Sequence, residues 1–324
     1  MNIPSPPDKF INLALLIVAC GICSSVEAQP SRRALVAPEV RFVSGRSTRA
    51  IPFELHNNHI YLRVRVNDSE PLLFILDSGA STHISRGRAE SLGLRLRGGQ
   101  RATGVGEDSV EASVVEGVSL NLSGVTLSRQ SLAAIPFESL QASLGRPVDG
   151  ILGYSFFSRL VVEVNYAARI INLYSPGGYR YRGRGERIPL IKDTDSGLIF
   201  ARARIKPLNR ASVNGLFEID SGGGHALILN RPFVERHRLL TPARGANPVF
   251  VGGIVGSSRA VRGTVESLRL GRVHIENVST LFSLATDGLL ASEEFEGNIG
   301  NDVLRRFKVI FDYSRRMMIL EPSP

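Results

Sequence analysis

The sequence is poor in cysteine, tryptophan and lysine. Its 324 residues include two cysteines and no tryptophan, and lysine occurs only at positions 9, 192, 206 and 308. Both cysteines, Cys20 and Cys23, lie in an apolar N-terminal segment. The body of the chain therefore has no thiol for a disulfide, a redox pair or a thiolate metal site. Its stability has to come from core packing.

Arginine carries most of the positive charge. The formal net charge is +9, which permits attraction to acidic polymers or anionic surfaces. The only dense cluster is Arg180, Arg182, Arg184 and Arg187, in a stretch rich in glycine and tyrosine. No nucleic-acid motif accompanies it. We expect a solvated linker and no nucleic-acid partner, with a basic surface patch as the alternative.

The N-terminus has the pattern of an export signal. A lysine precedes an apolar run at residues 10–23, and a small-residue cleavage site follows at residues 26–28. The run is short for a transmembrane helix, so residues 1–28 are predicted to be a secretory signal. The segment ending at Cys20 also resembles a bacterial lipobox, so a lipid anchor there, or an uncleaved anchor, is the alternative. We expect an exported protein, periplasmic, envelope-bound or secreted, with a leader at residues 29–47.

One short phrase occurs twice. Residues 74–80 read FILDSGA, and residues 217–223 read FEIDSGG. A period-two apolar pattern broken by turn residues precedes each copy, as in a half-buried hairpin. Asp77 and Asp220 therefore stand at equivalent places, 143 residues apart.

The repeat extends to the end of each half. Residues 150–173 align with residues 297–320 at a constant offset. The repeated unit is too long for the repeat of a solenoid, so the duplication indicates two homologous lobes. Many short apolar strands and 32 glycines favour an all-β fold. We predict two β-barrel-like lobes with a cleft between them, at residues 48–176 and 188–324, joined by a linker at residues 177–187.

Two aspartates at the ends of buried strands predict acid–base chemistry. Each following serine, Ser78 or Ser221, can orient a carboxylate, and the backbone N–H of Gly79 or Gly222 can point at it. Two carboxylates at hydrogen-bond distance cannot both ionise, so the pair holds one proton. One aspartate can then deprotonate a water while the other protonates a substrate carbonyl. No metal or cofactor is expected.

These motifs resemble those of aspartic proteases, in particular bacterial retropepsin-like enzymes. The resemblance covers roughly residues 50–324. Asp77-Ser78-Gly79-Ala80 is similar to the retroviral-type catalytic motif, and residues 151–153 and 298–300 are similar to the apolar-apolar-Gly element that crosses behind each catalytic loop. The resemblance implies that Asp77 and Asp220 are the catalytic residues. Because both lie in one chain, as in pepsin, it also implies a monomer.

The second copy departs from the family pattern. Gly223 lacks the usual hydroxyl or methyl group, and Asn298 is polar where the family has an apolar residue. Ala80 and Gly223 offer no hydroxyl to the carboxylates. Fewer donors to the charged form make a dyad less acidic, so we expect a pH optimum above that of a gastric-type enzyme.

Two glycine-rich hairpin tips are candidates for a substrate-binding flap. The first contains Gly104, Val105 and Gly106, and the second contains Gly253 and Ile254. The family's flap tyrosine is absent, because no tyrosine lies between Tyr61 and Tyr154. Plain surface hairpins are the alternative interpretation.

The sequence predicts an aspartic endopeptidase whose partner is a peptide or protein substrate. The alternative is a non-catalytic peptide-binding or envelope assembly module on the same duplicated fold.

Overall fold

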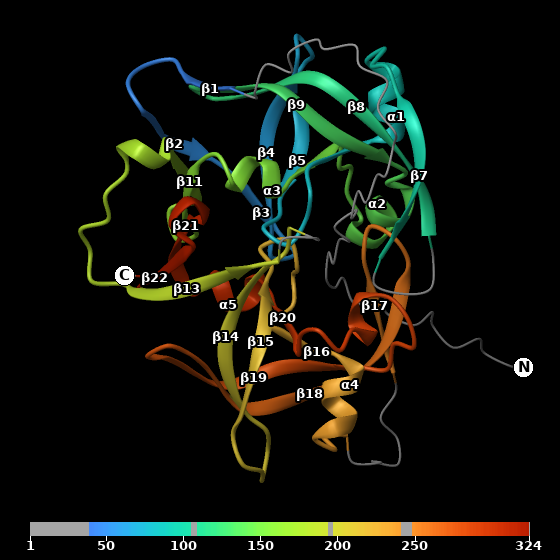
Figure 1. The fold of residues 1–324 in the computed structure, drawn as a ribbon, viewed down its shortest axis with the longest axis vertical. Helices are drawn as coiled ribbons and strands as arrows, with labels where there is room; N and C mark the ends of the chain where they lie inside the picture. The colour runs from blue at the N-terminus through green and yellow to red at the C-terminus, as the bar shows by residue number, and fades with distance from the viewer. Residues whose placement is uncertain (1–38, 105–108, 194–196, 241–247, 324) are drawn as a thin grey trace, which may run out of the picture.

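The computed structural model describes residues 39–104, 109–193, 197–240 and 248–323. The signal predicted at residues 1–28 lies outside these ranges. The described chain forms two β lobes, the first mostly blue to green and the second mostly yellow to red in Figure 1. The predicted all-β, two-lobed fold is therefore confirmed. Within the described ranges, no helix has both the length and the apolar character needed to cross a bilayer.

The first lobe is a strongly curved sheet with three short helices. Two central strands pair in parallel and are described below with the site. The strands are β1 (Glu39–Phe42), β3 (Glu54–His56), β4 (His59–Val66), β5 (Leu72–Leu76), β6 (His83–Ser85), β7 (Arg97–Thr103), β8 (Ser109–Leu122), β9 (Val125–Ile135) and β10 (Gly150–Leu152). The helices are α1 (Arg86–Ser91), α2 (Glu138–Leu144) and α3 (Tyr154–Phe157).

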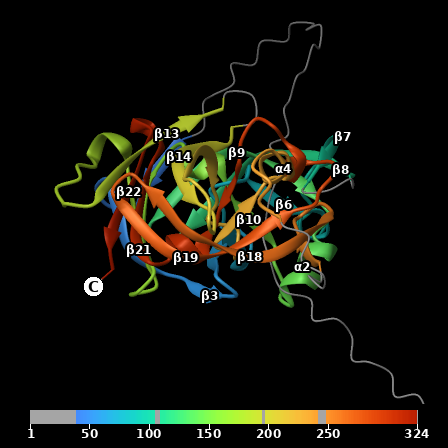
Figure 2. The same ribbon diagram turned by 90° about the horizontal axis from the view of Figure 1, so that it is seen from below.

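The second lobe repeats this plan. Its longest hairpin, β18 with β19, crosses the lobe as two adjacent strands (Figure 2). The strands are β14 (Ile199–Lys206), β15 (Val213–Ile219), β16 (Leu227–Leu229), β17 (Val249–Gly252), β18 (Ser257–Leu270), β19 (Val273–Ser283) and β20 (Gly297–Ile299). The helical segments are α4 (Arg231–Arg236), η2 (Leu289–Ala291) and α5 (Asn301–Leu304).

A shared sheet joins the lobes. Its central contact pairs β11 of the first half with β21 of the second, in antiparallel register. Phe157 packs edge-on against Phe311 and stacks on Tyr313, with ring centroids 5.1 and 5.4 Å apart. The sheet runs in the order β2 (Ser47–Pro52), β12 (Ile170–Tyr174), β11 (Val161–Asn165), β21 (Phe307–Asp312), β22 (Met317–Pro322) and β13 (Glu186–Lys192).

The element boundaries differ from the predicted divisions in two places. Residues 39–42, assigned above to a leader, form β1 and pair with β9. The stretch predicted as a linker at residues 177–187 follows the start of η1 (Pro176–Gly178) and runs into β13. Backbone pairing explains the first difference, because an edge strand needs no apolar pattern of its own to join a sheet.

Candidate active site

Each aspartate is placed by a parallel strand pair. Strand β5 pairs with β10, and β15 pairs with β20. The N–H of Asp77 donates to the carbonyl of Leu152, and that of Asp220 donates to Ile299, both at 3.0 Å. Both aspartates are fully buried. The duplicated strands therefore present two carboxyls at equivalent points of the two lobes.

The glycines that end β10 and β20 are required by close backbone contacts. A Cβ on Gly153 would lie 2.3 Å from the carbonyl oxygen of Ala80, and one on Gly300 would lie 2.4 Å from that of His225. No side chain fits at either distance. Each apolar-apolar-Gly element thus packs directly against the loop that follows its aspartate.

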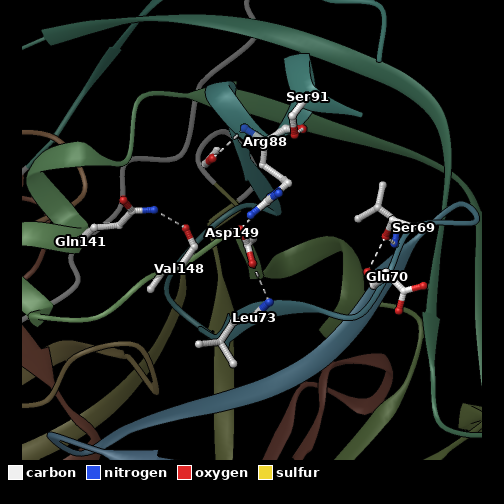
Figure 3. A network of polar contacts seen from close by, with 10 residues as sticks. Ser69, Glu70, Leu73, Arg88, Ser91, Gln141, Val148 and Asp149 are labelled. Atoms are coloured by element: carbon white, nitrogen blue, oxygen red, sulfur yellow. Dashed lines mark hydrogen bonds and ion pairs between the residues drawn. The ribbon is translucent and has the colours of Figure 1, made fainter. Parts of the chain in front are cut away.

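In each lobe an acidic side chain accepts a hydrogen bond from the backbone of the catalytic strand. Asp149 accepts from the backbone N–H of Leu73 at 2.8 Å and from Arg88 Nε at 2.8 Å (Figure 3). In the second lobe the carboxylate of Glu296 accepts from the N–H of Leu216. These two acidic residues precede the glycines that open β10 and β20, a signal that the sequence analysis did not use.

The two serines hold the loops together reciprocally. The N–H of Ser78 donates to Ser221 Oγ at 3.0 Å, and the N–H of Ser221 donates to Ser78 Oγ at 2.9 Å. Each hydroxyl also donates across the lobes, Ser78 to Ile219 O at 2.7 Å and Ser221 to Leu76 O at 3.1 Å. The serines were expected to orient the carboxylates; instead, their hydroxyls bond to the backbone of the opposite lobe and hold the two loops together.

We expect Ser78→Ala and Ser221→Ala each to lower the free energy of unfolding by about 1–3 kcal/mol, because each leaves a buried N–H without an acceptor. The double variant should lose less than the sum of the single losses, since the four bonds form one network. Urea unfolding measures the free energy of unfolding of the two single variants and the double variant. Ser257→Ala, at an exposed position, is the control and should change that free energy by close to zero. Strict additivity would contradict the reciprocal network.

The carboxyls face each other across the two motif glycines. The N–H of Gly79 donates to Asp77 Oδ1 at 2.9 Å, and the N–H of Gly222 donates to Asp220 Oδ1 at 2.7 Å. A Cβ on Gly222 would lie 2.1 Å from Asp77 Cγ, and one on Gly79 would lie 3.2 Å from Asp220 Cγ. The loop of each lobe therefore touches the carboxyl of the other.

The two carboxyls differ in acidity. Burial, followed by the neighbouring charge of Asp220, raises the pKa of Asp77 well above its usual range. Burial also raises the pKa of Asp220, to about 6, and hydrogen bonds from Asn298, from Asp77 and from two backbone amides limit that rise. The pKa of each carboxyl depends on the other. At neutral pH this arrangement favours a proton on Asp77 and a charge on Asp220.

The sequence analysis missed a third buried carboxyl and a histidine. Glu218 lies on β15, and its Oε2 accepts from Asn298 Nδ2 at 2.9 Å. The same Nδ2 is 3.1 Å from Asp220 Oδ2, and Asn298 Oδ1 is 2.6 Å from His225 Nε2. Glu218 interrupts an apolar strand in the printed sequence, and this polar break was the available signal.

The expected shortage of hydrogen-bond donors applies to one lobe only. Neither Ala80 nor Gly223 supplies a hydroxyl, as anticipated. However, the amide of Asn298 and the N–H of Gly223 both donate to Asp220. Asp220 is therefore well supplied with donors, whereas the only donor from outside the carboxyl pair found for Asp77 among the described residues is the N–H of Gly79.

The two glycine-rich hairpins contact each other across the lobes. Gly104, Gly253 and Ile254 are buried, and a Cβ on Gly104 would collide with the carbonyl of Val255. Ile254 and Val255, from the second lobe, pack in an apolar cluster of the first lobe. The flap candidates Val105 and Gly106 lie outside the described residues.

A duplicated β fold with a carboxyl pair at the junction of its lobes defines the class of two-lobed aspartic protease-like proteins. Residues 62–156 match the family model for aspartyl protease. This part of the chain is therefore similar to the aspartyl protease family, and the two-lobed all-β fold is consistent with it. The match includes Asp77 and ends before the second lobe. No curated protein matches the sequence.

Proposed function

We propose that the protein is an endopeptidase that hydrolyses peptide bonds with the Asp77–Asp220 dyad. The observation that carries the proposal is the buried carboxyl pair, in which the motif glycine of each lobe lies against the carboxyl of the other and the two acidities differ. The similarity of residues 62–156 to the aspartyl protease family supports a peptidase in general. The reaction type and the two residue roles are inferred from the site.

The unequal acidities assign the steps. Ionised Asp220 takes a proton from a water molecule as the water oxygen attacks the peptide carbonyl carbon. Protonated Asp77 gives its proton to the carbonyl oxygen, which forms a neutral tetrahedral diol. On collapse, the C–N bond breaks and the amine nitrogen takes the proton held by Asp220. A diol hydroxyl returns its proton to Asp77, which restores the starting state.

The surroundings of the site suggest the kind of substrate. An extended peptide can lie between the lobes under the tips that contain Gly104 and Gly253, bonded through flap backbone. One chain supplies both aspartates, which favours a monomer. We also propose export, to the periplasm, the cell envelope or the medium, on the pattern of residues 1–28, with membrane attachment only through that segment or a lipid on Cys20.

The test is cleavage of a mixed peptide library by the purified protein between pH 3 and 8. Wild type should cleave, and Asp77→Asn and Asp220→Asn should each abolish cleavage while remaining folded. Cleavage that persists in both variants would exclude the dyad. Peptide binding without cleavage in wild type would instead favour the non-catalytic binding module.

A further inference from the structure

The two lobes differ at one pair of facing residues beside the dyad. In the first lobe β5 places Ile75 opposite Ile151, and in the second lobe β15 places Glu218 opposite Asn298. The isoleucines pack in an apolar cluster. Their counterparts are a carboxyl and an amide, both buried. The equivalent positions of the two lobes can therefore be compared directly. An apolar pair lies next to Asp77, and a polar pair lies next to Asp220.

The amide of Asn298 has one orientation that satisfies its neighbours. Its Nδ2 lies between two carboxyl acceptors, Asp220 Oδ2 at 3.1 Å and Glu218 Oε2 at 2.9 Å. Its Oδ1 lies 2.6 Å from His225 Nε2. If the amide were turned over, its oxygen would face the two carboxyls and its NH₂ would face the imidazole.

The histidine fixes this orientation as a neutral donor. Burial lowers the pKa of His225 to about 4, so the ring carries one N–H at neutral pH. The tautomer that matches the 2.6 Å contact with Asn298 Oδ1 carries this N–H on Nε2, which then donates to the amide oxygen. The other ring nitrogen, Nδ1, has no hydrogen-bond partner among the described residues.

We propose that Asn298, oriented by His225, is the positioning residue that makes Asp220 rather than Asp77 the charged member of the dyad. It supplies the side-chain donor that Gly223 lacks, from the neighbouring strand instead of the catalytic loop. The catalytic consequence rests on the proposed function; the effect on ionisation does not.

Several other titratable groups surround this arrangement. Asp77 and Glu218 lie close enough to affect the ionisation of Asp220 or of each other. His59 and Asp302 act on His225, and Tyr313 donates to the carbonyl of Ser78 at 3.2 Å. Apart from the interaction of Asp220 with its dyad partner Asp77, Asn298 is the only side-chain donor to Asp220 among the described residues, so loss of its amide leaves no side-chain donor from outside the dyad.

The experiment measures ionisation directly. The side-chain carboxyls of aspartate are labelled with ¹³C in the full chain and titrated by NMR, and the pH profile of kcat/KM is recorded in parallel. The dyad titrates with two apparent pKa values. Asn298→Leu should raise the lower value by about one pH unit or more and reduce kcat/KM on the acidic side roughly tenfold to hundredfold, as for loss of a hydrogen bond to a charged group. Partial recovery is expected as the pH rises.

The histidine is tested by two replacements. His225→Gln keeps an N–H donor toward Asn298 and should retain most of the wild-type titration, whereas His225→Phe removes it and should shift the lower pKa in the same direction as Asn298→Leu. The exposed residues Asn214 and His274 provide matched controls: Asn214→Leu and His274→Phe should leave both readouts unchanged. The double variant Glu218→Gln with Asn298→Leu removes the titration of Glu218. The rise in the lower apparent pKa should persist in it, which would assign that rise to Asp220.

Each outcome decides the proposal. A lower apparent pKa that stays at the wild-type value in folded Asn298→Leu would overturn it, and so would equal effects of His225→Gln and His225→Phe. If wild type cleaves no peptide but Asn298→Leu shifts the titration, the endopeptidase function fails and the positioning role stands. Should Asn298→Leu fail to fold, Asn298→Ser replaces it, with a smaller shift in the same direction expected.

Discussion

Asp77→Asn and Asp220→Asn are each expected to reduce kcat/KM by about 10³-fold or more while making the protein more stable at neutral pH. The loss of activity follows from removal of the general acid or the general base. The two single losses should not add in the double variant, because the aspartates act as a unit. The exposed Asp68→Asn serves as a control that changes neither property.

The gain in stability follows from the raised pKa values. A carboxyl whose pKa is higher in the folded than in the unfolded protein contributes stability below its unfolded pKa, and this contribution is lost as the pH rises through the folded value. For Asp220, with a folded pKa of about 6, the loss falls between roughly pH 4 and that value. For Asp77 the loss extends to higher pH, because its pKa is raised further.

An uncharged asparagine avoids that loss, so the melting temperature of each variant should exceed that of wild type by a margin that grows from pH 4 to pH 8. Asp77→Asn should gain more, because Asp220→Asn also gives up hydrogen bonds made to a charged oxygen. Thermal unfolding across this range measures both. A margin independent of pH would show that the carboxyls are not protonated through burial, and retained cleavage in either variant would show that the dyad does not do the chemistry.

The sequence predicted the features that repeat and missed those that do not. The strand–turn–strand patterns before Asp77 and Asp220 rest on period-two alternation, which reports burial of one face of a strand locally. The duplicated phrase then placed both aspartates without any tertiary information. These features required no knowledge of distant contacts, and the all-β lobes are confirmed.

The missed features all depend on pairing between distant segments. Strand β1 forms because Glu39–Phe42 pairs with residues of β9 that lie 83 to 89 positions further along the chain, and the shared sheet forms because β11 pairs with β21. Asn298 was visible only as a departure from an apolar pattern. Its role requires knowing that Glu218, Asp220 and His225 converge on one amide, and no local periodicity carries that information.

Gly222→Ala is expected to damage both the fold and the dyad, because its new methyl group would collide with a catalytic carboxyl. The added Cβ would lie 2.1 Å from Cγ and 2.2 Å from Oδ2 of Asp77. Asp77 cannot move aside easily, because its N–H is bonded to β10 and its carboxyl to the N–H of Gly79. Overpacking of this kind costs about 1–3 kcal/mol or more, and a misplaced carboxyl should reduce kcat/KM by about 10²-fold or more.

Two other Gly→Ala variants, at positions with more space for the added methyl group, serve as comparisons. At Gly79 the nearest atom would be Glu218 Oε1, the end of a flexible side chain, at 2.8 Å, so Gly79→Ala should be less harmful. Gly87, inside α1, has open space around its Cβ position, and Gly87→Ala should stabilise by up to about 1 kcal/mol through helix propensity. Gly222→Ala should therefore have the lowest free energy of unfolding and the lowest rate of peptide cleavage of the three variants. Gly79→Ala should be intermediate and Gly87→Ala highest, as measured by urea unfolding and peptide cleavage. Wild-type activity in Gly222→Ala would mean that the second-lobe loop does not press against the Asp77 carboxyl, and the face-to-face geometry of the dyad would have to be abandoned.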